Sequence, residues 1–310
     1  MRRTLRCLTS LLLLSGCASA RVRPAPAQLF AFHQGFWLNL HQILLAEGRP
    51  HRRPVPGPPH DDPRWAEAIA FYQADYSQRF FLDEELARIN EQLALEDGPT
   101  PGAAVPGPLR EALSRVAPAY RESEWAEDQL RSQKWLAAAQ GLLARHGAAF
   151  AQDVSRVFHA PWPGGPTRVE LSKQAGPFGA FSLGQPLLIT LSSADPVYQD
   201  DAALEMLFHE AAHGLDGPVV QALERACARR AMPVPQSLGH AILFFSVGEL
   251  ARVRLGHDYL PYAYKNGLYP RSPGWTKYEA ALRSQWIPYL DGRIELDPAM
   301  DSLVAAVSGP

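Results

Sequence analysis

The stretch Met206–Leu215, with the sequence MLFHEAAHGL, constrains the fold more than any other part of the chain. Two histidines in it, His209 and His213, stand four residues apart, and residues at this spacing lie on the same face of an α-helix. Apart from Glu210, the positions between and around them are uncharged, which is typical of a buried helix. The stretch therefore predicts a buried helix that presents two imidazoles from one face.

Two imidazoles at this spacing can bind a single Zn²⁺ ion, because imidazole nitrogen is one of the common ligands of zinc. Glu210 follows His209 directly, so on a helix its carboxylate lies toward the neighbouring edge of the same face. From there it can act as a general base on a water near the metal without being a ligand itself. The alternative is a pair of structural histidines with no metal.

The residues HEAAH in their uncharged surroundings resemble the HExxH motif of the zincin metallopeptidases. The resemblance implies a catalytic zinc ion held by His209 and His213, with Glu210 as the catalytic base. The metzincin pattern requires a glycine and a histidine where this chain has Asp216 and Val219, so that subfamily is excluded. The remaining resemblance is to the gluzincins, which take a third ligand from a glutamate on a later helix.

A catalytic zinc site needs a third protein ligand and one open position. Glu249 is the first candidate, because it stands in an otherwise apolar helical stretch, where a lone carboxylate is costly unless it is paired or bound to a metal. The alternative for Glu249 is an ion pair with Arg252 or Arg254. His240 is either an alternative ligand or a group beside the ligands or the substrate. It stands nine residues before Glu249, roughly half a turn out of phase, so one straight helix could not easily supply both ligands.

Three further residues are candidates for supporting roles. Asp216 could orient an imidazole through the nitrogen that does not face the metal, or it could simply be an acid at a helix end. The resemblance to gluzincins also implies a tyrosine or histidine that stabilises the developing oxyanion. Tyr262 and His257 are candidates for that role, in the Tyr-rich part of the chain after Glu249.

Hydrophobic periodicity over the rest of the chain predicts an α+β fold that is mostly helical. Helices are expected at 29–47, 64–82, 83–96, 108–117 and 122–149 before the motif, and at 219–231, 237–255, 273–286 and 297–306 after it. Two short apolar runs, 168–171 and 186–191, predict a small sheet directly before the HExxH helix. The resemblance to zincins implies that an edge strand of this sheet holds an extended peptide. Leu187–Leu191 is the candidate edge strand, with an inner strand as the alternative.

Local signals set the expected ends of the HExxH helix and the roles of two other histidines. Asp200 or Asp201 is expected to cap the start of the helix, and Gly217-Pro218 is expected to end it. His33 and His41 fall in the first expected helix. We expect them to be packed or solvated there, with a distal contact to substrate as the alternative.

The N-terminus is typical of an export signal, with three arginines at positions 2, 3 and 6 before the apolar run Leu8–Leu14. That run is too short to span a bilayer. Residues 14–17, LSGC, resemble the bacterial lipobox, which implies cleavage before Cys17 and acylation of Cys17. The alternative is an ordinary signal peptide cut near residues 18–20. Two or three acyl chains would anchor the mature protein to a membrane.

The expected organisation is therefore a lipoprotein signal peptide (1–16), a tether (17–28), an N-terminal helical region (29–150) and a zincin-like metallopeptidase region (151–310). A chain of 310 residues that is 46% hydrophobic can bury a sizeable core. Its net charge of −2 becomes more negative once the signal arginines are removed, which argues against nucleic-acid binding. Only Cys227 would then remain as a thiol, so no intramolecular disulfide is expected.

We therefore expect a zinc-dependent peptidase, tethered by a lipid to the bacterial envelope, at the outer membrane and facing the periplasm. Its partners would be a peptide or protein substrate and the membrane. One alternative is a non-catalytic envelope lipoprotein with a vestigial HExxH, whose aromatic helices bind a partner. Another is a zinc hydrolase that acts on a bond other than the peptide bond.

Overall fold

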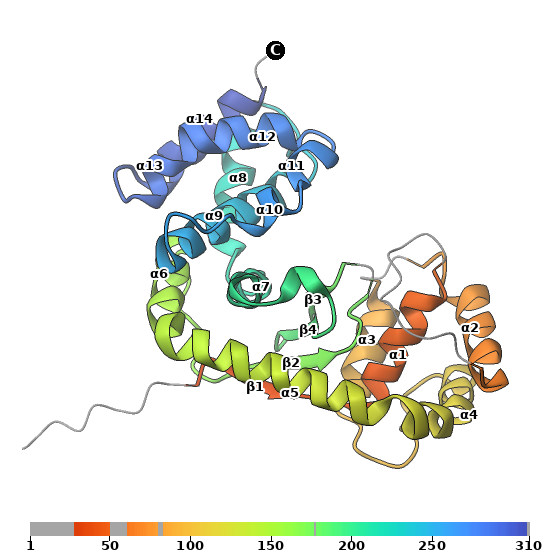
Figure 1. Ribbon diagram of the computed structural model, residues 1–310. Coiled ribbons are helices and arrows are strands. Elements are labelled where there is room, and N and C mark those ends of the chain that lie inside the picture. The colour runs from red at the N-terminus through yellow and green to blue at the C-terminus, as the bar shows by residue number, and fades with distance from the viewer. Residues whose placement is uncertain (1–27, 50–60, 80–82, 177, 309–310) are drawn as a thin grey trace, which may run out of the picture.

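The computed structural model describes residues 28–49, 61–79, 83–176 and 178–308. The expected signal peptide, Cys17 and nearly all of the expected tether lie outside these residues. Figure 1 shows three groups of elements: a helical lobe near the N-terminus, a small central sheet beside helix α7, and a group of C-terminal helices. The expected α+β class, mostly helical with a small sheet before the HExxH helix, is confirmed.

The sheet has four strands in the spatial order β1-β2-β4-β3. The strands are β1 (Phe30–His33), β2 (Thr167–Ser172), β3 (Ala180–Leu183) and β4 (Leu188–Ser192). Strands β1, β2 and β4 run parallel, whereas β3 is antiparallel to β4 and forms an edge. All five residues of β4 are buried, as a strand flanked on both sides requires. The expected strands 168–171 and 186–191 are thus confirmed as β2 and β4.

Two expectations about the strands are wrong. The expected edge strand, Leu187–Leu191, coincides with β4 from Leu188 onward, and β4 is an inner strand because it pairs with β2 on one side and β3 on the other. The expected helix 29–47 begins only at Phe36, because the first residues pair with β2 instead. These first residues form β1, and Phe30 anchors β1 in the core because it is 2% exposed and packs edge-to-face against Phe208.

The N-terminal lobe consists of four helices, α1 (Phe36–Glu47), α2 (Pro63–Asp75), α3 (Glu84–Ala94) and α4 (Gly107–Ser123). Asp62 and Asp83 are the N-cap residues of α2 and α3. Their carboxylates accept hydrogen bonds from backbone N–H groups of the first turn. His41 of α1 is fully buried, and its Nδ1 lies 2.6 Å from the Tyr72 hydroxyl. His41 is thus a packed residue of the lobe, and His33 is an exposed residue of β1.

A long helical rod connects the lobe to the rest of the molecule. Helix α5 (Trp125–Leu142) continues through a π-helical turn (Leu143–Gly147) into α6 (Ala148–Phe158). Figure 1 shows this rod running along the sheet from the lobe toward the C-terminal helices. Phe150 of the rod stacks on Phe208 of α7 with ring centroids 4.2 Å apart. The rod therefore packs directly behind the helix that carries the HExxH motif.

The remaining helices follow the sheet in sequence. The longer ones are α7 (Asp201–Ala212), α8 (Gly217–Arg229), α9 (Leu238–Leu255), α12 (Trp275–Ala281) and α14 (Leu296–Ser308). Short helices lie between them: α10 (Tyr262–Lys265), α11 (Leu268–Arg271) and α13 (Ile287–Leu290). Cys227 is buried in α8 with a free thiol. None of the described helices combines the length and the apolar character needed to cross a bilayer.

Two large hydrophobic cores hold these elements together. The smaller one lies inside the lobe and includes the side chain of Leu188 from the sheet. The larger one contains residues of the sheet, of the α5–α6 rod and of the C-terminal helices. Strand β1 and helix α5 thus pack with the C-terminal elements, although they come before residue 150 in the chain.

Candidate metal centre

Helix α7 carries the HExxH motif at its carboxyl end. Its residues from Ala202 to Ala212 are all buried, as the uncharged sequence predicts. The helix ends at Ala212, earlier than expected, and His213 is the first residue after it. Gly217-Pro218 is not the end of this helix but the start of α8, where proline is favoured because the first turn needs no N–H donor. Asp200 does occupy the N-cap position of α7, but its side chain makes no capping hydrogen bond.

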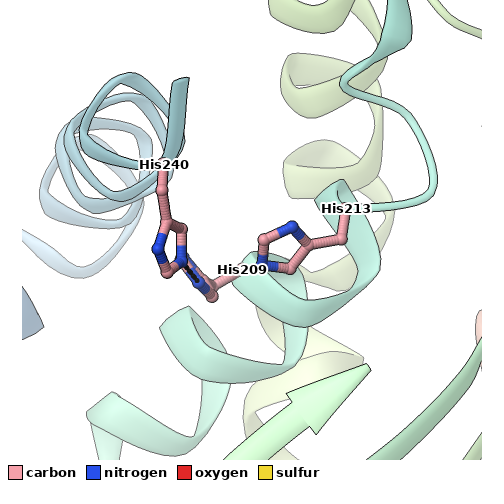
Figure 2. A group of neighbouring side chains, drawn as sticks. All are labelled: His209, His213 and His240. Carbon is pink, nitrogen blue, oxygen red and sulfur yellow. Dashed lines mark hydrogen bonds between the residues drawn. The ribbon is translucent and has the colours of Figure 1, made fainter. Parts of the chain in front are cut away.

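His240, in the first turn of α9, completes a group of three imidazoles with His209 and His213. One ligand nitrogen from each ring lies within 4.8 Å of the other two. The ring centroids form a nearly equilateral triangle with sides of 5.1, 5.3 and 5.4 Å. Figure 2 shows the three rings converging from the two helices. This is the one group of at least three potential ligand side chains found among the described residues.

The spacing of the nitrogens fits a tetrahedral metal. The Nε2 atoms of His209 and His240 are 3.4 Å apart. Two nitrogens at zinc-bond distance from one tetrahedral ion are separated by about 3.3 Å. The Nδ1 atom of His209 is buried and has no hydrogen-bond partner among the described residues. This pair of nitrogens therefore fits one tetrahedral ion, and one nitrogen of His213 lies within 4.8 Å of a ligand nitrogen of each of the other two rings.

All three imidazoles are neutral at pH 7, which is the form that binds metals. Burial and, to a smaller extent, the neighbouring His240 lower the pKa of His213 to about 4. Burial also lowers the pKa of His240 to about 4 and the pKa of His209 well below its usual value. As a whole residue His240 is exposed, but its ring lies against Phe244 and Trp275, which removes water from it.

The three histidines differ in their contact with solvent. His209 is 2% exposed, whereas the side chain of His213 is 32% exposed and His240 is exposed. The cluster therefore lies at the surface, where a water or a substrate can approach it from the side of His213 and His240. The ring of Phe244 packs against the cluster, with its centroid 3.8 Å from that of His209 and 4.7 Å from that of His240. An open side is required of a catalytic metal site, as opposed to a closed structural one.

Glu210 is buried beside the cluster and is held by one hydrogen bond from the sheet. The hydroxyl of Ser182, on edge strand β3, donates to its Oε2 at 2.9 Å. Burial raises the pKa of Glu210 to about 7, although the hydrogen bond from Ser182 opposes this rise. A carboxyl group with a pKa near 7 can both take and return a proton at neutral pH, which suits a general acid–base group.

The structure does not bring Glu249, the first-choice third ligand, to His209 and His213, whereas it brings His240, the alternative, to them. Glu249 lies on the other side of α9 and forms an ion pair with Arg252, the alternative that the sequence left open. The helical phase explains this result, because nine residues correspond to two and a half turns. The buried carboxylate is compensated by a guanidinium rather than by a metal.

The other candidates lie outside the ligand set. Asp216 faces His213, with Oδ2 3.9 Å from Nδ1, which is too long for a hydrogen bond. His257 is exposed and lies beside Arg252, away from the three imidazoles. Tyr262 is buried, and its hydroxyl lies 3.0 Å from that of Tyr198. Either hydroxyl can be the donor in this contact, and the Tyr198 hydroxyl also lies within hydrogen-bond distance of the Phe178 carbonyl.

Three residues near the site were not expected from the sequence. Ser182 lies on a strand of only four residues, too short to give a periodic signal. Phe244 stands four residues after His240, a spacing that by itself indicates only packing. Glu205 stands four residues before His209 and is 1% exposed. Its spacing from His209 is the one sequence signal that could have identified it, because it places an acid on the same face of the helix as the histidines.

Comparison with models of known protein families, with curated protein sequences and with solved structures gives no significant match. The case for a function therefore depends on the chemistry of this site.

Proposed function

We propose that this protein is a zinc-dependent peptidase. The observation that carries the proposal is the group of three neutral imidazoles, His209, His213 and His240, with the Glu210 carboxyl on the same helix beside it. Three histidines with one open position are a known ligand set for catalytic zinc. The exposed side of the cluster supports catalysis rather than a purely structural role.

The residues of the chain have separate tasks in this proposal. His209, His213 and His240 would hold the ion. A bound zinc ion would supply Lewis acidity, which polarises a carbonyl group and lowers the pKa of water. Glu210 would accept a proton from the attacking water and deliver it to the leaving amine, as its pKa near 7 allows. Ser182 would keep the Glu210 carboxylate in place.

The position of β3 supports a peptide as the substrate, rather than a molecule with another type of bond. Strand β3 lies at the edge of the sheet, and among the described residues no strand pairs with its outer side. An extended peptide could add to this edge through backbone hydrogen bonds. Ser182 of the same strand contacts Glu210, so a peptide bound along β3 would lie close to the proposed base.

The proposal includes a lipid anchor at Cys17, which would tether the protein to the bacterial envelope, at the outer membrane and facing the periplasm. The basic and apolar segments before Cys17 and the sequence LSGC support this part. The negative net charge supports a peptide or protein, rather than nucleic acid, as the partner of the folded part.

Metal analysis and a Glu210→Gln variant test the proposed activity. Protein purified without chelator is expected to contain about one zinc ion per chain. The variant keeps all three imidazoles, so it should retain zinc while losing about 10³-fold in the rate of peptide hydrolysis. Full activity of the variant would remove Glu210 as the base. Zinc near zero in the wild-type protein would favour a non-catalytic envelope lipoprotein.

A further inference from the structure

The N-terminal lobe contacts the chain segment that leads into edge strand β3. This segment, the β2–β3 loop, has described residues 173–176, 178 and 179. The Oδ1 atom of Asn39 accepts a hydrogen bond from the backbone N–H of Lys173 at 2.8 Å. The Oε1 atom of Gln42 accepts one from the backbone N–H of Gly176, also at 2.8 Å. Both amide side chains come from α1 and are fully buried.

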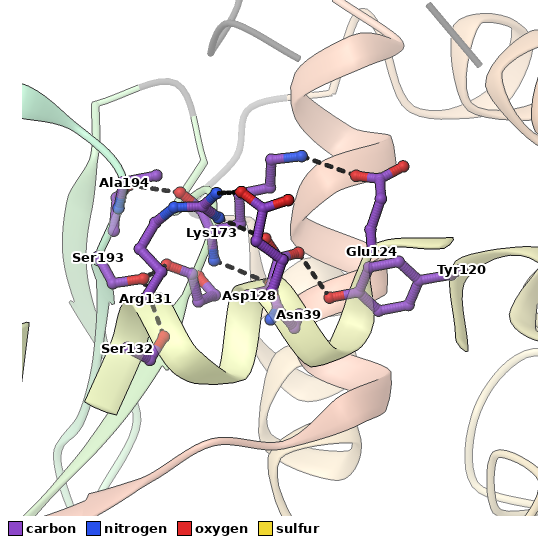
Figure 3. A network of polar contacts seen from close by, with 12 residues as sticks. Asn39, Tyr120, Glu124, Asp128, Arg131, Ser132, Lys173, Ser193 and Ala194 are labelled. Atoms are coloured by element: carbon purple, nitrogen blue, oxygen red, sulfur yellow. Dashed lines mark hydrogen bonds and ion pairs between the residues drawn. The ribbon is translucent and has the colours of Figure 1, made fainter. Parts of the chain in front are cut away.

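Neighbouring polar groups fix these two contacts. The Nε2 of Gln42 donates to Oδ1 of Asn90 on α3 at 2.6 Å, so the Gln42 amide has a defined orientation. The Lys173 ammonium forms an ion pair with Glu124 at 2.7 Å, and both side chains are largely buried. Figure 3 shows Asn39, Glu124 and Lys173 in one network of polar contacts. Buried polar groups are costly unless they are satisfied, so the satisfied members of this network favour one arrangement of the lobe against the loop. The Nδ2 atom of Asn39 is buried without a hydrogen-bond partner among the described residues, so the contact of Asn39 with the loop is made by its Oδ1 atom.

The loop and strand β3 form one unit. Ala175 of the loop packs with Phe181 of the strand in a small hydrophobic cluster separate from the two large cores. At the other end of β3, Gly184 has a φ of +79° and lies against α3 of the lobe. A Cβ atom at Gly184 would come within 2.2 Å of the Glu91 carboxylate. The lobe therefore contacts the chain on both sides of β3.

Between these two contacts, Ser182 donates its hydrogen bond to Glu210. We propose that Asn39 and Gln42 are positioning residues, through which the N-terminal lobe sets the place of edge strand β3 and, by way of Ser182, the orientation of the Glu210 carboxylate. Neither amide touches the histidines or the carboxylate itself. The catalytic part of this inference rests on the proposed function, whereas the structural part does not.

Two variants of similar shape, Asn39→Leu and Gln42→Met, test these contacts without leaving a cavity. Asn39→Leu removes the acceptor of the Lys173 N–H, whereas Gln42→Met removes both the acceptor of the Gly176 N–H and the donor to Asn90. Leu113→Ala is the matched control, because Leu113 is fully buried in the same lobe but belongs to its hydrophobic core. Hydrogen exchange of the backbone amides in β3 is measured on the full-length protein by mass spectrometry. We expect exchange about fivefold faster in each acceptor variant and unchanged in the control. Equal exchange in wild type and both acceptor variants would overturn the proposal.

Peptide hydrolysis and zinc content complete the test. We expect kcat to fall about fivefold in Asn39→Leu and in Gln42→Met, with zinc content unchanged, while Leu113→Ala keeps the wild-type kcat. An equal fall in Leu113→Ala would assign the effect to lost stability and would contradict a positioning role. If β3 exchanges faster in the acceptor variants but the wild-type protein hydrolyses no peptide, the lobe still positions the strand and the proposed function is what fails.

Discussion

Replacing Glu205 with glutamine is expected to stabilise the protein at neutral and alkaline pH and to leave its stability near pH 4.5 almost unchanged. Glu205 lies on α7 one turn before His209 and is 1% exposed. Its Oε2 accepts hydrogen bonds from the Tyr259 hydroxyl at 2.6 Å and from the Tyr262 backbone N–H at 2.9 Å. Burial nevertheless raises the pKa of Glu205 from 4.5 to about 7. A glutamine keeps the acceptor oxygen and carries no charge, so it resembles the protonated acid at every pH.

The sign and size of the effect follow from the two pKa values. Because the pKa of Glu205 is higher in the folded state, the folded state binds the proton more tightly than the unfolded state does. The stability that this proton contributes is fully present below pH 4.5 and is lost as the pH rises through 7. Each pKa unit corresponds to about 1.4 kcal/mol, so the free energy of unfolding falls by about 3 kcal/mol over this range.

Urea unfolding at several pH values compares the wild-type protein with Glu205→Gln, both in the presence of a chelator so that metal binding does not contribute. The two stabilities should meet near pH 4.5 and differ by about 3 kcal/mol at about pH 8, with the variant more stable. In Tyr259→Phe the charged form of Glu205 loses a hydrogen bond that lowers its pKa, so the fall should extend to higher pH. A difference between wild type and Glu205→Gln that is constant over the whole range would refute the reasoning.

Three more predictions concern the site and the anchor. His240→Ala is expected to weaken zinc binding about 100-fold in a chelator competition titration, because it removes one of the three proposed ligands. The control Glu249→Gln should bind zinc as the wild type does, and equal zinc affinity of the two variants would contradict the assignment of His240. Ser182→Ala is expected to lower kcat about fivefold without loss of zinc, and an unchanged kcat would show that its hydrogen bond does not hold the base. Cys17→Ser is expected to move the protein from the membrane fraction to the soluble fraction of cells, and a variant that stays with the membranes would rule out the lipid anchor.

The sequence was most informative where the chemistry is local. Helical spacing alone predicts that His209 and His213 lie one turn apart on one side of a helix, and the structure keeps them together although His213 is the C-cap residue that follows α7. The uncharged residues around them predict the burial of the helix. The residue that joins the two histidines of the motif could not be derived in this way, because the packing of α9 against α7 decides which face of α9 meets them. The burial of Glu249 was predicted correctly. A buried carboxylate can be compensated by a basic side chain as well as by a metal ion, and in the structure Arg252 forms the ion pair with Glu249.

The strands show a similar limit. Strands β2 and β4 were found because they are apolar runs between turn signals. Strands β1 and β3 have four residues each, and β1 leads almost directly into helix α1, so its aromatic residues fit a helical pattern equally well. The position of the sheet edge depends on the order of strands in space, which no local pattern contains. Ser182 was missed both because β3 is too short to give a periodic signal and because its place at the sheet edge depends on that order, and the contact between the sheet and Glu210 was missed with it.

Strands β1 and β2 pair in parallel although Phe30 and Thr167 are 137 residues apart, and the whole N-terminal lobe and the α5–α6 rod are inserted between them. Closing so long a segment costs chain entropy and makes this pairing slow, whereas the lobe helices can form from local contacts around their own core. We therefore expect the lobe to gain protection before the strands in pulse-labelled refolding. The three imidazoles come together only after α7 and α9 have both docked, so capture of an ion would follow the collapse of the chain rather than direct it.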